Sequence, residues 1–310
     1  MHKTLPLSLI FVILLTLSSC GGVKGLGIGE SPAPGSPNPI PSPGGRAAIG
    51  HIVLVVEENR SYGDVIGNTA AAPYMNSLAT QYSLATQYFA NAHPSIGDYF
   101  MMSTGQLITL DDSFTGVVSD DNIVRELNRA GKSWKAYAES IPSVGYTGGN
   151  SGPYLKRHNP LSFFSDVVND STQSARLVPF SQFSADLSTN SLPNFSWVVP
   201  NVNDDAHDGS LAGADSWLQT NIGPLLSNPQ FQQDGLLIIV FDEGDTFDLE
   251  NIGGHVPAIL VGPSVKRGYQ STTFYQHQST LRLILTSLGV TALPGAAAGA
   301  PDMTEFFQKQ

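Results

Sequence analysis

The chain has 310 residues, 41% hydrophobic and 13% charged, a composition typical of a folded protein with material for one large domain or two ordinary ones. Its 15 basic and 26 acidic side chains give a net charge of −11, which argues against a general nucleic-acid-binding surface because such a surface needs a basic footprint. An anionic substrate would have to be attracted locally, by a metal ion or by a few placed residues.

The amino terminus has the pattern of an export signal. His2 and Lys3 precede an apolar run from Leu5 to Leu17, and the tetrapeptide LSSC at positions 17–20 resembles the bacterial lipobox, whose cysteine is lipidated. We expect residues 1–20 to be a lipoprotein signal peptide; a plain secretory signal or a short membrane anchor is the alternative. Because Cys20 is the only cysteine, disulfides and thiolate metal clusters are excluded, and lipid attachment to the membrane is its evident use.

Residues 21–49 are predicted to be a tether. Between Gly21 and Gly45 the sequence contains eight Gly and six Pro, which favours an extended, partly polyproline-II chain over helix or sheet. No second linker follows Gly50, so residues 50–310 are predicted to form one catalytic domain.

Beyond the tether, strand and helix patterns alternate, which is typical of a βα-wound sheet. The apolar run from Ile52 to Val56 predicts a strand buried on both faces. Further strands are predicted at 133–138, 195–199, 236–241 and 256–261, and helices at 73–84, 121–130, 215–226 and 278–288. Residues 141–194 are predicted to form irregular loops over one edge. The fold class is therefore α/β with a mostly parallel central sheet.

Two of these strands end in acids and an amide. Glu58 and Asn59 follow the first strand, and Asp242 and Glu243 follow the strand at 236–241. Ligands bind at the carboxyl ends of such strands, and three anionic groups among four oxygen ligands would be costly to hold together without a cation. All-oxygen ligation suits Mg²⁺, Ca²⁺ or Mn²⁺. The alternative is that the acids are solvated or cap the following helices.

Ser95, in the segment HPSIGDY at 93–99, is predicted to lie in the first turn of a helix. Its hydroxyl would then lie among unpaired backbone N–H groups at the positive end of the helix dipole, which favours an attacking alkoxide and a bound phosphate. The alternative is an ordinary N-cap serine.

Histidines stand in three further polar segments. His207 precedes Asp208 in a loop after the strand at 195–199, where it could bind metal or donate a proton to a leaving group. His255 lies in a Gly-rich context before a buried strand, and His158 in KRHNP is ambiguous on chemistry alone. His51 and His277 are expected to be structural.

Seven segments in order between Gly50 and Gly289 carry a family resemblance: EENRSYGDVIG, HPSIGDYFMMSTG, KRHNP, PNVNDDAHDGS, VFDEGD, GGHVPAILVGPSVKRG and YQHQSTLRLI. Together they resemble the bacterial phosphoesterase family of acid phosphatases and phospholipases C, within the alkaline-phosphatase-like superfamily. The resemblance implies an α/β/α sandwich and a metal-dependent hydrolase of phosphate esters that works through a phosphoserine intermediate.

The resemblance also implies roles for individual residues. Its metal ligands fall on Glu58, Asn59, Asp242 and Glu243, which leaves Glu57 as a bystander. Its nucleophile falls on Ser95, and its phosphate-contacting histidines fall on His158 and His207, with Asp208 and His255 as further substrate-binding candidates.

Asp98 departs from the pattern of the family, in which relatives commonly carry Asn. An ionised Asp98 can only accept hydrogen bonds and would repel a phosphate dianion, so either it joins a second metal site or the loop binds substrate differently.

Acid-phosphatase-like hydrolysis of phosphomonoesters is the expected activity. The alternative is a phospholipase C acting on headgroup diesters, and a more remote one is a lipoprotein that binds phospho-ligands without turnover. A metal-free carboxylester hydrolase is disfavoured because the sequence contains no Gly-x-Ser-x-Gly motif.

Overall fold

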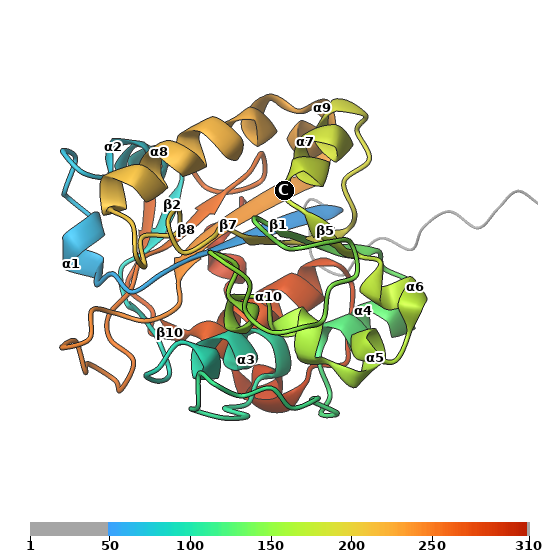
Figure 1. The fold of residues 1–310 in the computed structure, drawn as a ribbon. Helices are drawn as coiled ribbons and strands as arrows, with labels where there is room; N and C mark the ends of the chain where they lie inside the picture. Colours follow the sequence, from blue (N-terminus) through green and yellow to red (C-terminus); the bar gives the residue numbers. More distant parts are fainter. Residues whose placement is uncertain (1–48, 309–310) are drawn as a thin grey trace, which may run out of the picture. The chain divides into compact units, whose positions relative to one another are not determined.

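The computed structural model describes residues 49–308. The predicted signal peptide, the lipid on Cys20 and nearly all of the predicted tether lie outside the described residues. Within them, an eight-stranded sheet is covered by helices on both faces (Figure 1). The α/β/α sandwich implied by the resemblance is thereby confirmed.

The strand order of the main sheet is β5-β4-β6-β1-β7-β8-β2-β9. All neighbouring strands run parallel except β8, which is antiparallel to both β7 and β2. The strands are β1 (His51–Glu57), β2 (Ser83–Ala85), β4 (Trp134–Ala138), β5 (Leu177–Pro179), β6 (Phe195–Val199), β7 (Gly235–Phe241), β8 (Ala258–Val261) and β9 (Tyr269–Ser271). A second, two-stranded sheet pairs β3 (Tyr88–Phe89) with β10 (Tyr275–Gln276).

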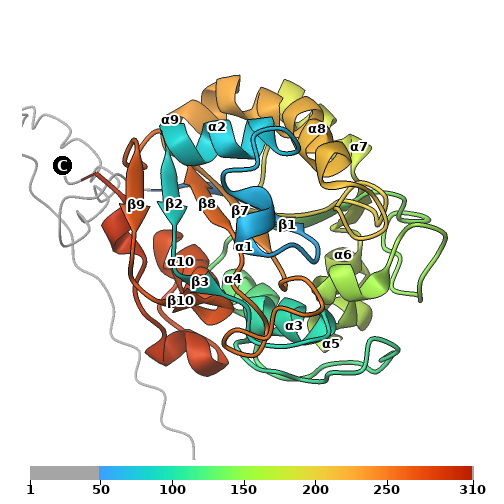
Figure 2. The same cartoon turned by 90° about the vertical axis from the view of Figure 1, so that its left-hand side faces the viewer.

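Two layers of helices enclose the sheet. One face carries α2 (Pro73–Gln81), α7 (Ser181–Ser188), α8 (Leu211–Asn221) and α9 (Pro229–Asp234). The other carries α3 (Ile96–Thr104), α4 (Ile123–Arg129), α5 (Ser165–Val168), α6 (Ser171–Ser174) and α10 (His277–Ser287). The short α1 (Tyr62–Val65) lies at the carboxyl end of β1 (Figure 2). Short 3₁₀ turns are η1 (Lys156–His158), η2 (Pro160–Phe163), η3 (Gly223–Ser227), η4 (Gly295–Gly299) and η5 (Thr304–Phe306).

Strand β1 lies at the centre of the sheet, between β6 and β7. Its Leu54 pairs with Trp197 on one side and Ile238 on the other, and Ile52 to Val56 are all buried. The prediction of a strand covered on both faces is confirmed. Because β1 and β7 are parallel neighbours in register to their last residues, Glu57 and Phe241, the polar residues after each strand emerge side by side.

Several predicted boundaries were wrong. The predicted helix 73–84 ends at Gln81, because Ser83–Ala85 pairs with β8 and β9 instead. Helix α8 begins four residues before the predicted Asp215, after Ser210, whose hydroxyl accepts a hydrogen bond from Gly213 N at 3.0 Å. The segment 141–194, predicted to be irregular, contains the edge strand β5 and the helices α5, α6 and α7.

The carboxyl-terminal residues of the described chain are held by Glu305. Burial alone would raise the pKa of Glu305, but hydrogen bonds donated by Ser271, Tyr275 and Tyr269 outweigh burial and lower this pKa to about 2. No helix within residues 49–308 is long and apolar enough to cross a membrane.

Candidate active site

Ser95 immediately precedes helix α3 but does not cap it. It has a helical backbone conformation and makes no side-chain cap hydrogen bond. Its hydroxyl instead lies 2.7 Å from Glu243 Oε1 and 3.3 Å from Glu58 Oε2, and the side chain is buried. The N-cap alternative is therefore wrong, and the hydroxyl is directed to the acids at the ends of β1 and β7.

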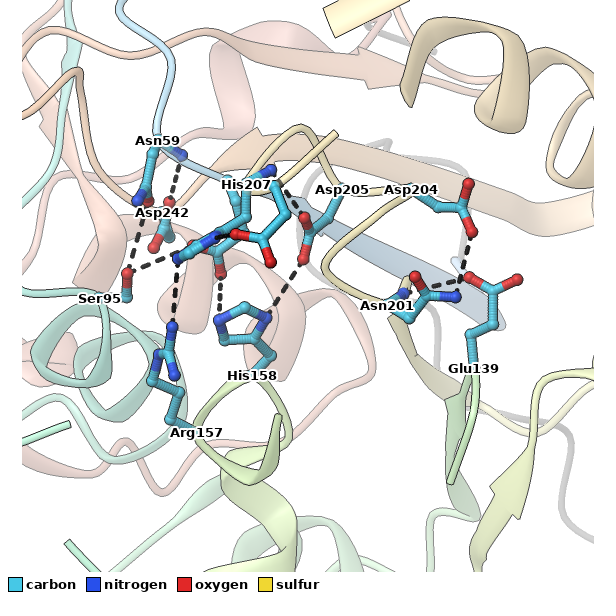
Figure 3. Close-up of polar contacts among 12 residues, drawn as sticks. Asn59, Ser95, Glu139, Arg157, His158, Asn201, Asp204, Asp205, His207 and Asp242 are labelled. Atoms are coloured by element: carbon cyan, nitrogen blue, oxygen red, sulfur yellow. Dashed lines mark hydrogen bonds and ion pairs between the residues drawn. The ribbon is translucent and has the colours of Figure 1, made fainter. Parts of the chain in front are cut away.

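The predicted metal-ligand set comes together near this serine, and Figure 3 shows Asn59 and Asp242 of the set beside Ser95. Asn59 N donates to Asp242 Oδ1 at 3.1 Å, and Asn59 Oδ1 lies 3.5 Å from Ser95 Oγ. Asn59 has a φ of +52°, a left-handed conformation that Asn tolerates better than most residues. This turn directs both the backbone N–H and the side-chain oxygen of Asn59 toward the strand ends.

The donor chemistry of this cluster fits a hard divalent cation. Asn59 Oδ1 faces only other acceptors; with the amide reversed, its nitrogen would donate to Glu58 Oε2 at 2.9 Å, Glu243 Oε1 at 3.2 Å and Asp242 Oδ1 at 3.3 Å. Inward-facing oxygens at this density are stabilised by a cation, and all-oxygen donors favour Mg²⁺, Ca²⁺ or Mn²⁺. Burial, and secondarily the charge of Glu243, raises the pKa of Asp242 to about 8.

Glu58 also belongs to a second group, with His158 and Asp205. His158 Nε2 lies 3.1 Å from Glu58 Oε1, and His158 Nδ1 lies 3.2 Å from Asp205 Oδ2. One ligand atom from each of these three buried residues lies within 4.8 Å of the others, so this group could also hold a metal ion. Burial, followed by the charges of Arg157 and His207, lowers the pKa of His158, so the imidazole is neutral and able to act as a ligand.

His207 stands in the loop between β6 and α8, close to this second group. Its Nδ1 lies 2.7 Å from Asp208 Oδ1, its Nε2 lies 3.2 Å from an Arg157 nitrogen, and its ring centroid is 5.9 Å from that of His158. The side chain is partly exposed, so a substrate can reach it. The structure thus brings the predicted His158, His207 and Asp208 to one place.

The loop that carries His207 is braced from three sides. Arg60 donates to the carbonyl oxygens of Ala206 at 2.9 Å and Gly209 at 3.4 Å. Asp205 Oδ1 accepts a hydrogen bond from His207 N at 2.8 Å. At the start of the loop Asn201 bonds both Glu139 and Asp204, as Figure 3 shows.

Two predicted substrate-binding residues lie elsewhere. His255 is stacked between the rings of Tyr62 at 4.4 Å and Phe89 at 4.7 Å, and its Nε2 donates to Thr86 O at 3.0 Å. No described contact joins His255 to Ser95, so its role toward substrate stays a prediction.

Asp98 is fully buried behind the ligand set. Its Oδ1 accepts from Asn91 N at 2.7 Å and lies 3.4 Å from His277 Nε2, which also donates to the backbone oxygen of Asp242 at 2.5 Å. The Asp98 side chain therefore lies behind Asp242; its backbone N donates to Ser95 O at 3.0 Å, but no described contact joins its carboxylate to the Ser95 hydroxyl. The expected structural role of His277 agrees with this position, as does that of His51, paired with Asp234 at 2.6 Å.

Sequence reasoning missed four residues of the site. His93 forms an ion pair with Glu243; this hydrogen bond is the main reason that the pKa of His93 is raised to about 9. Tyr99 hydrogen-bonds Glu58 Oε1 and stacks on His158 at 5.2 Å. The other two missed residues are Asp205 and Arg157. All four lie within the segments that carried the resemblance, and that position was the only signal in the sequence that could have identified them.

Glu57 differs from Glu58 although the two are adjacent. Glu57 is fully buried, both of its carboxylate oxygens lack a hydrogen-bond partner, and burial, followed by the charges of Asp205 and Asp215, raises its pKa well above the usual value. No described contact joins Glu57 to Ser95, in agreement with its interpretation as a bystander.

Comparisons with known proteins identify the family of this chain. The profile of the Phosphoesterase family matches residues 68–291. A probable acid phosphatase of Kluyveromyces lactis is 33% identical over 76% of this chain and 57% of its own length. A protein of Mycobacterium tuberculosis named phosphatidylinositol-3-phosphatase is 31% identical over 99% of this chain and 94% of its own.

More distant similarities concern a phospholipase and the fold. Phospholipase C B of M. tuberculosis is 25% identical over 58% of this chain and 42% of its own length. An alkaline phosphatase superfamily protein of Vibrio parahaemolyticus superposes with a TM-score of 0.57 at 14% identity, over 80% of this chain and 68% of its own, which concerns the fold alone. The chain spans only 57% of the length of the two acid phosphatases that head these comparisons.

Proposed function

We propose that this chain, which belongs to the Phosphoesterase family, is a phosphoric ester hydrolase with Ser95 as its nucleophile. The observation that carries the proposal is the position of the Ser95 hydroxyl, which leaves the helix uncapped and lies 2.7 Å from Glu243 Oε1 within a buried group of oxygen donors. A serine held in this way is set up to lose its proton and attack.

In the proposed reaction, Ser95 Oγ passes its proton to Glu243 Oε1, 2.7 Å away, and attacks phosphorus in line with the ester oxygen. The bond from phosphorus to that oxygen breaks, a phosphoserine forms, and the leaving alcohol takes a proton from His207. A water molecule then attacks the phosphoserine and gives one proton to His207, while Glu243 returns its proton to the departing Ser95 Oγ, which releases inorganic phosphate and restores the hydroxyl. His207 suits both steps because it is partly exposed and its Nδ1 is oriented by Asp208.

Glu58, Asn59, Asp242 and Glu243 are proposed to hold a divalent cation beside Ser95. When bound, the cation would favour the ionised serine and offset the negative charge of the phosphoryl oxygens. The identity and number of cations are left open, since Glu58, His158 and Asp205 could hold a second one. Arg157 adds a positive charge, and His158 adds a neutral imidazole, to a site otherwise dominated by acids.

The substrate we propose is a phosphomonoester, as for an acid phosphatase. Relatives named acid phosphatase and phosphatidylinositol-3-phosphatase support monoesters, the latter on a lipid headgroup. A phospholipase C acting on diesters is the second candidate, supported by the weaker similarity to phospholipase C B. We also propose that the protein is exported and attached to the membrane through a lipid on Cys20, because of the lipobox-like sequence at 17–20.

The test compares Ser95→Ala with Ser103→Ala, a buried serine of helix α3 whose hydroxyl bonds only backbone carbonyl oxygens, Tyr99 O at 2.7 Å and Phe100 O at 3.3 Å. With p-nitrophenyl phosphate and Mn²⁺ or Mg²⁺, Ser95→Ala should lose roughly 10⁴-fold or more in kcat, while Ser103→Ala should retain activity within about threefold. Acid quenching of the wild-type protein during turnover should trap phosphate on the peptide that contains Ser95.

Equal activity of the two variants would refute the nucleophile assignment. Release of p-nitrophenol from p-nitrophenyl phosphorylcholine but not from the monoester would favour the phospholipase C alternative. Phosphate binding without any product from either substrate would favour a binding lipoprotein.

A further inference from the structure

The loop from Gly244 to Gly254, which follows the ligands Asp242 and Glu243, exposes a cluster of large apolar side chains. Phe247 is 91% exposed, Ile252 71% and Leu249 68%, all within six residues. Single exposed apolar residues are ordinary on a protein surface, but a cluster of them marks an interaction site. Figure 1 shows this loop, in orange, projecting from the end of the sheet that also carries α1.

The exposure is built into the loop. Asp248 accepts hydrogen bonds from Ser61 Oγ at 2.7 Å, His255 N at 3.1 Å and Glu250 N at 3.1 Å, and Gly244 N donates across the loop to Gly253 O at 2.8 Å. This hydrogen bonding fixes the backbone and leaves the apolar side chains outside.

The backbone conformation of Ile252 also indicates that the exposed apolar side chains have a role. It has a φ of +83°, a left-handed conformation that is unfavourable for a β-branched residue and that glycine would adopt freely. An exposed isoleucine at a position suited to glycine costs stability and solubility, and at 71% exposure it gains little from packing within residues 49–308.

The loop is directly connected to the catalytic residues. His93 Nε2 donates to the backbone oxygen of Asp248 at 3.0 Å, while the other nitrogen of the same ring pairs with Glu243. In the first turn of α3, the exposed Leu107 and Leu110 lie against Gly97, two residues after Ser95, where an added Cβ would be 3.3 and 2.8 Å from their methyl groups. Exposed apolar side chains therefore lie both on the loop bonded to His93 and beside the first turn of α3.

We propose that Phe247, Leu249 and Ile252 dock on the hydrocarbon layer of a phospholipid membrane, so that Ser95 meets a phosphate ester carried on a lipid. This inference rests on the proposed function. It specifies that the alcohol part of the phosphate ester carries acyl chains. An apolar surface next to a site that cleaves phosphate esters suits a substrate whose alcohol part is apolar. Transfer of three such side chains from water into hydrocarbon is strongly favourable.

Charge decides which membrane surface this loop fits. Within 244–254 the sequence carries Asp245, Asp248 and Glu250 and no Lys or Arg. A loop of this kind is repelled by anionic headgroups, so we assign it a zwitterionic surface and expect docking that is insensitive to salt.

The chain length before β1 permits this orientation. The loop lies at the carboxyl end of the sheet, while the chain enters β1 at its amino end, and a seven-residue strand is about 23 Å long. Residues 21–48 can span up to roughly 90–100 Å, so a lipid anchor at Cys20 leaves the loop free to face the same membrane.

The test places a fluorescent probe at Leu249 or, as control, at Val144, an apolar side chain of another loop that is 58% exposed. In the full chain with Cys20→Ser, which removes the only native cysteine, Leu249→Cys or Val144→Cys is labelled with an environment-sensitive dye. On phosphatidylcholine vesicles the probe at 249 should shift to the blue and be quenched by lipids brominated on their acyl chains. The probe at 144 should do neither.

A second arm measures hydrolysis by the combined variant Phe247→Ser, Leu249→Ser, Ile252→Gly. It should keep activity on p-nitrophenyl phosphate within about twofold and lose at least tenfold on a phosphatidylinositol monophosphate held in phosphatidylcholine vesicles. Val144→Ser should change neither activity.

Failure of the docking proposal can be distinguished from failure of the proposed function. No spectral shift at 249, equal shifts at both positions, or a shift on raising protein concentration without vesicles would overturn docking, and the last would indicate a second copy as occupant. Absence of hydrolysis of every ester by the wild-type protein would refute the proposed function alone, since the probe still reports docking.

Discussion

Asp242→Asn distinguishes the effect of Asp242 on metal binding from its effect on the stability of the fold. Metal binding requires the ionised carboxylate, whereas burial of that charge destabilises the fold. In the presence of a chelator this carboxyl group destabilises the fold, because it is fully buried next to Glu243 and its pKa is raised to about 8. In the presence of a divalent cation the ionised form is required. The substitution should therefore stabilise the chelated protein while it abolishes the stabilisation by metal.

The magnitude follows from the pKa of Asp242. An acid whose folded-state pKa is raised destabilises the fold as the pH rises from its unfolded value, 3.8, toward its folded value, about 8. At pH 7 the pH lies roughly three units above the unfolded value, and at 1.36 kcal/mol per unit the burden is about 4 kcal/mol. The amide introduced by Asp242→Asn is neutral at every pH, so the advantage of the variant should be about 4 kcal/mol at pH 7, level off above about pH 8 and vanish below about pH 4.

The assay is thermal unfolding of both proteins with EDTA and with Mn²⁺ or Mg²⁺. At pH 7 with EDTA, Asp242→Asn should raise Tm by up to roughly 8–16 °C, since each kcal/mol is worth about 2–4 °C in a domain of this size. A cation at 100 times its Kd should stabilise the wild-type protein by about 2.7 kcal/mol and leave the variant unchanged. A chelated variant less stable than the chelated wild-type protein, or a wild-type Tm indifferent to EDTA, would refute the reasoning.

Three further predictions concern the loop of His207 and the carboxyl terminus. His207→Asn should lower kcat by roughly 10²–10⁴-fold on an alkyl phosphate and far less on p-nitrophenyl phosphate, whose leaving group needs no proton; equal losses on both would contradict the general-acid role. Arg60→Met should cost up to about 10²-fold through misplacement of the His207 loop, with partial recovery in Arg60→Lys and no additional loss in combination with His207→Asn. Glu305→Gln should destabilise the fold by about 1–2 kcal/mol at pH 7, discounted for its partial exposure, and the difference should vanish as the pH falls from about 4.5 through about 2, because a lowered carboxyl pKa stabilises only above that range; an unchanged acid-unfolding profile would contradict it.

The central part of the fold was predictable because its signals are local. The apolar runs of β1, β6 and β7 are continuous, and Phe195–Val199 was predicted to the residue. Strands β2, β5 and β9 have only three residues each, too few for a periodic pattern, and their pairing partners lie far away in the chain. The reversed direction of β8 depends on the connection between strands, which composition does not reveal.

The ligand set was predictable for a different reason. Parallel neighbours deliver the residues after each strand to the same edge, so Glu58 and Asp242 could be paired once both strands were recognised. Asp205 and His93 could not be assigned in this way, because their positions depend on how two loops fold back on the sheet. Asp205 Oδ2 lies 3.2 Å from His158 Nδ1 in a loop that turns at Ala206, which has a φ of +74°.

Adjacent Glu57 and Glu58 show how closely the site depends on the register of β1. Side chains alternate along a strand, so only one of two neighbouring acids can face Ser95, and a shift of one residue would exchange them. Both are fully buried, and burial raises the pKa of both. Glu57→Gln, which replaces an acid without hydrogen-bond partners, should therefore retain metal-dependent stability and activity.

Glu58→Gln, the matched change one residue later, should lose both properties, because Glu58 Oε2 faces Ser95 while Oε1 faces His158 and Tyr99. Metal titration by calorimetry and kcat with p-nitrophenyl phosphate would measure the contrast. If Glu57→Gln abolished metal binding while Glu58→Gln preserved it, the assignment of the carboxyl end of β1 would have to be reversed.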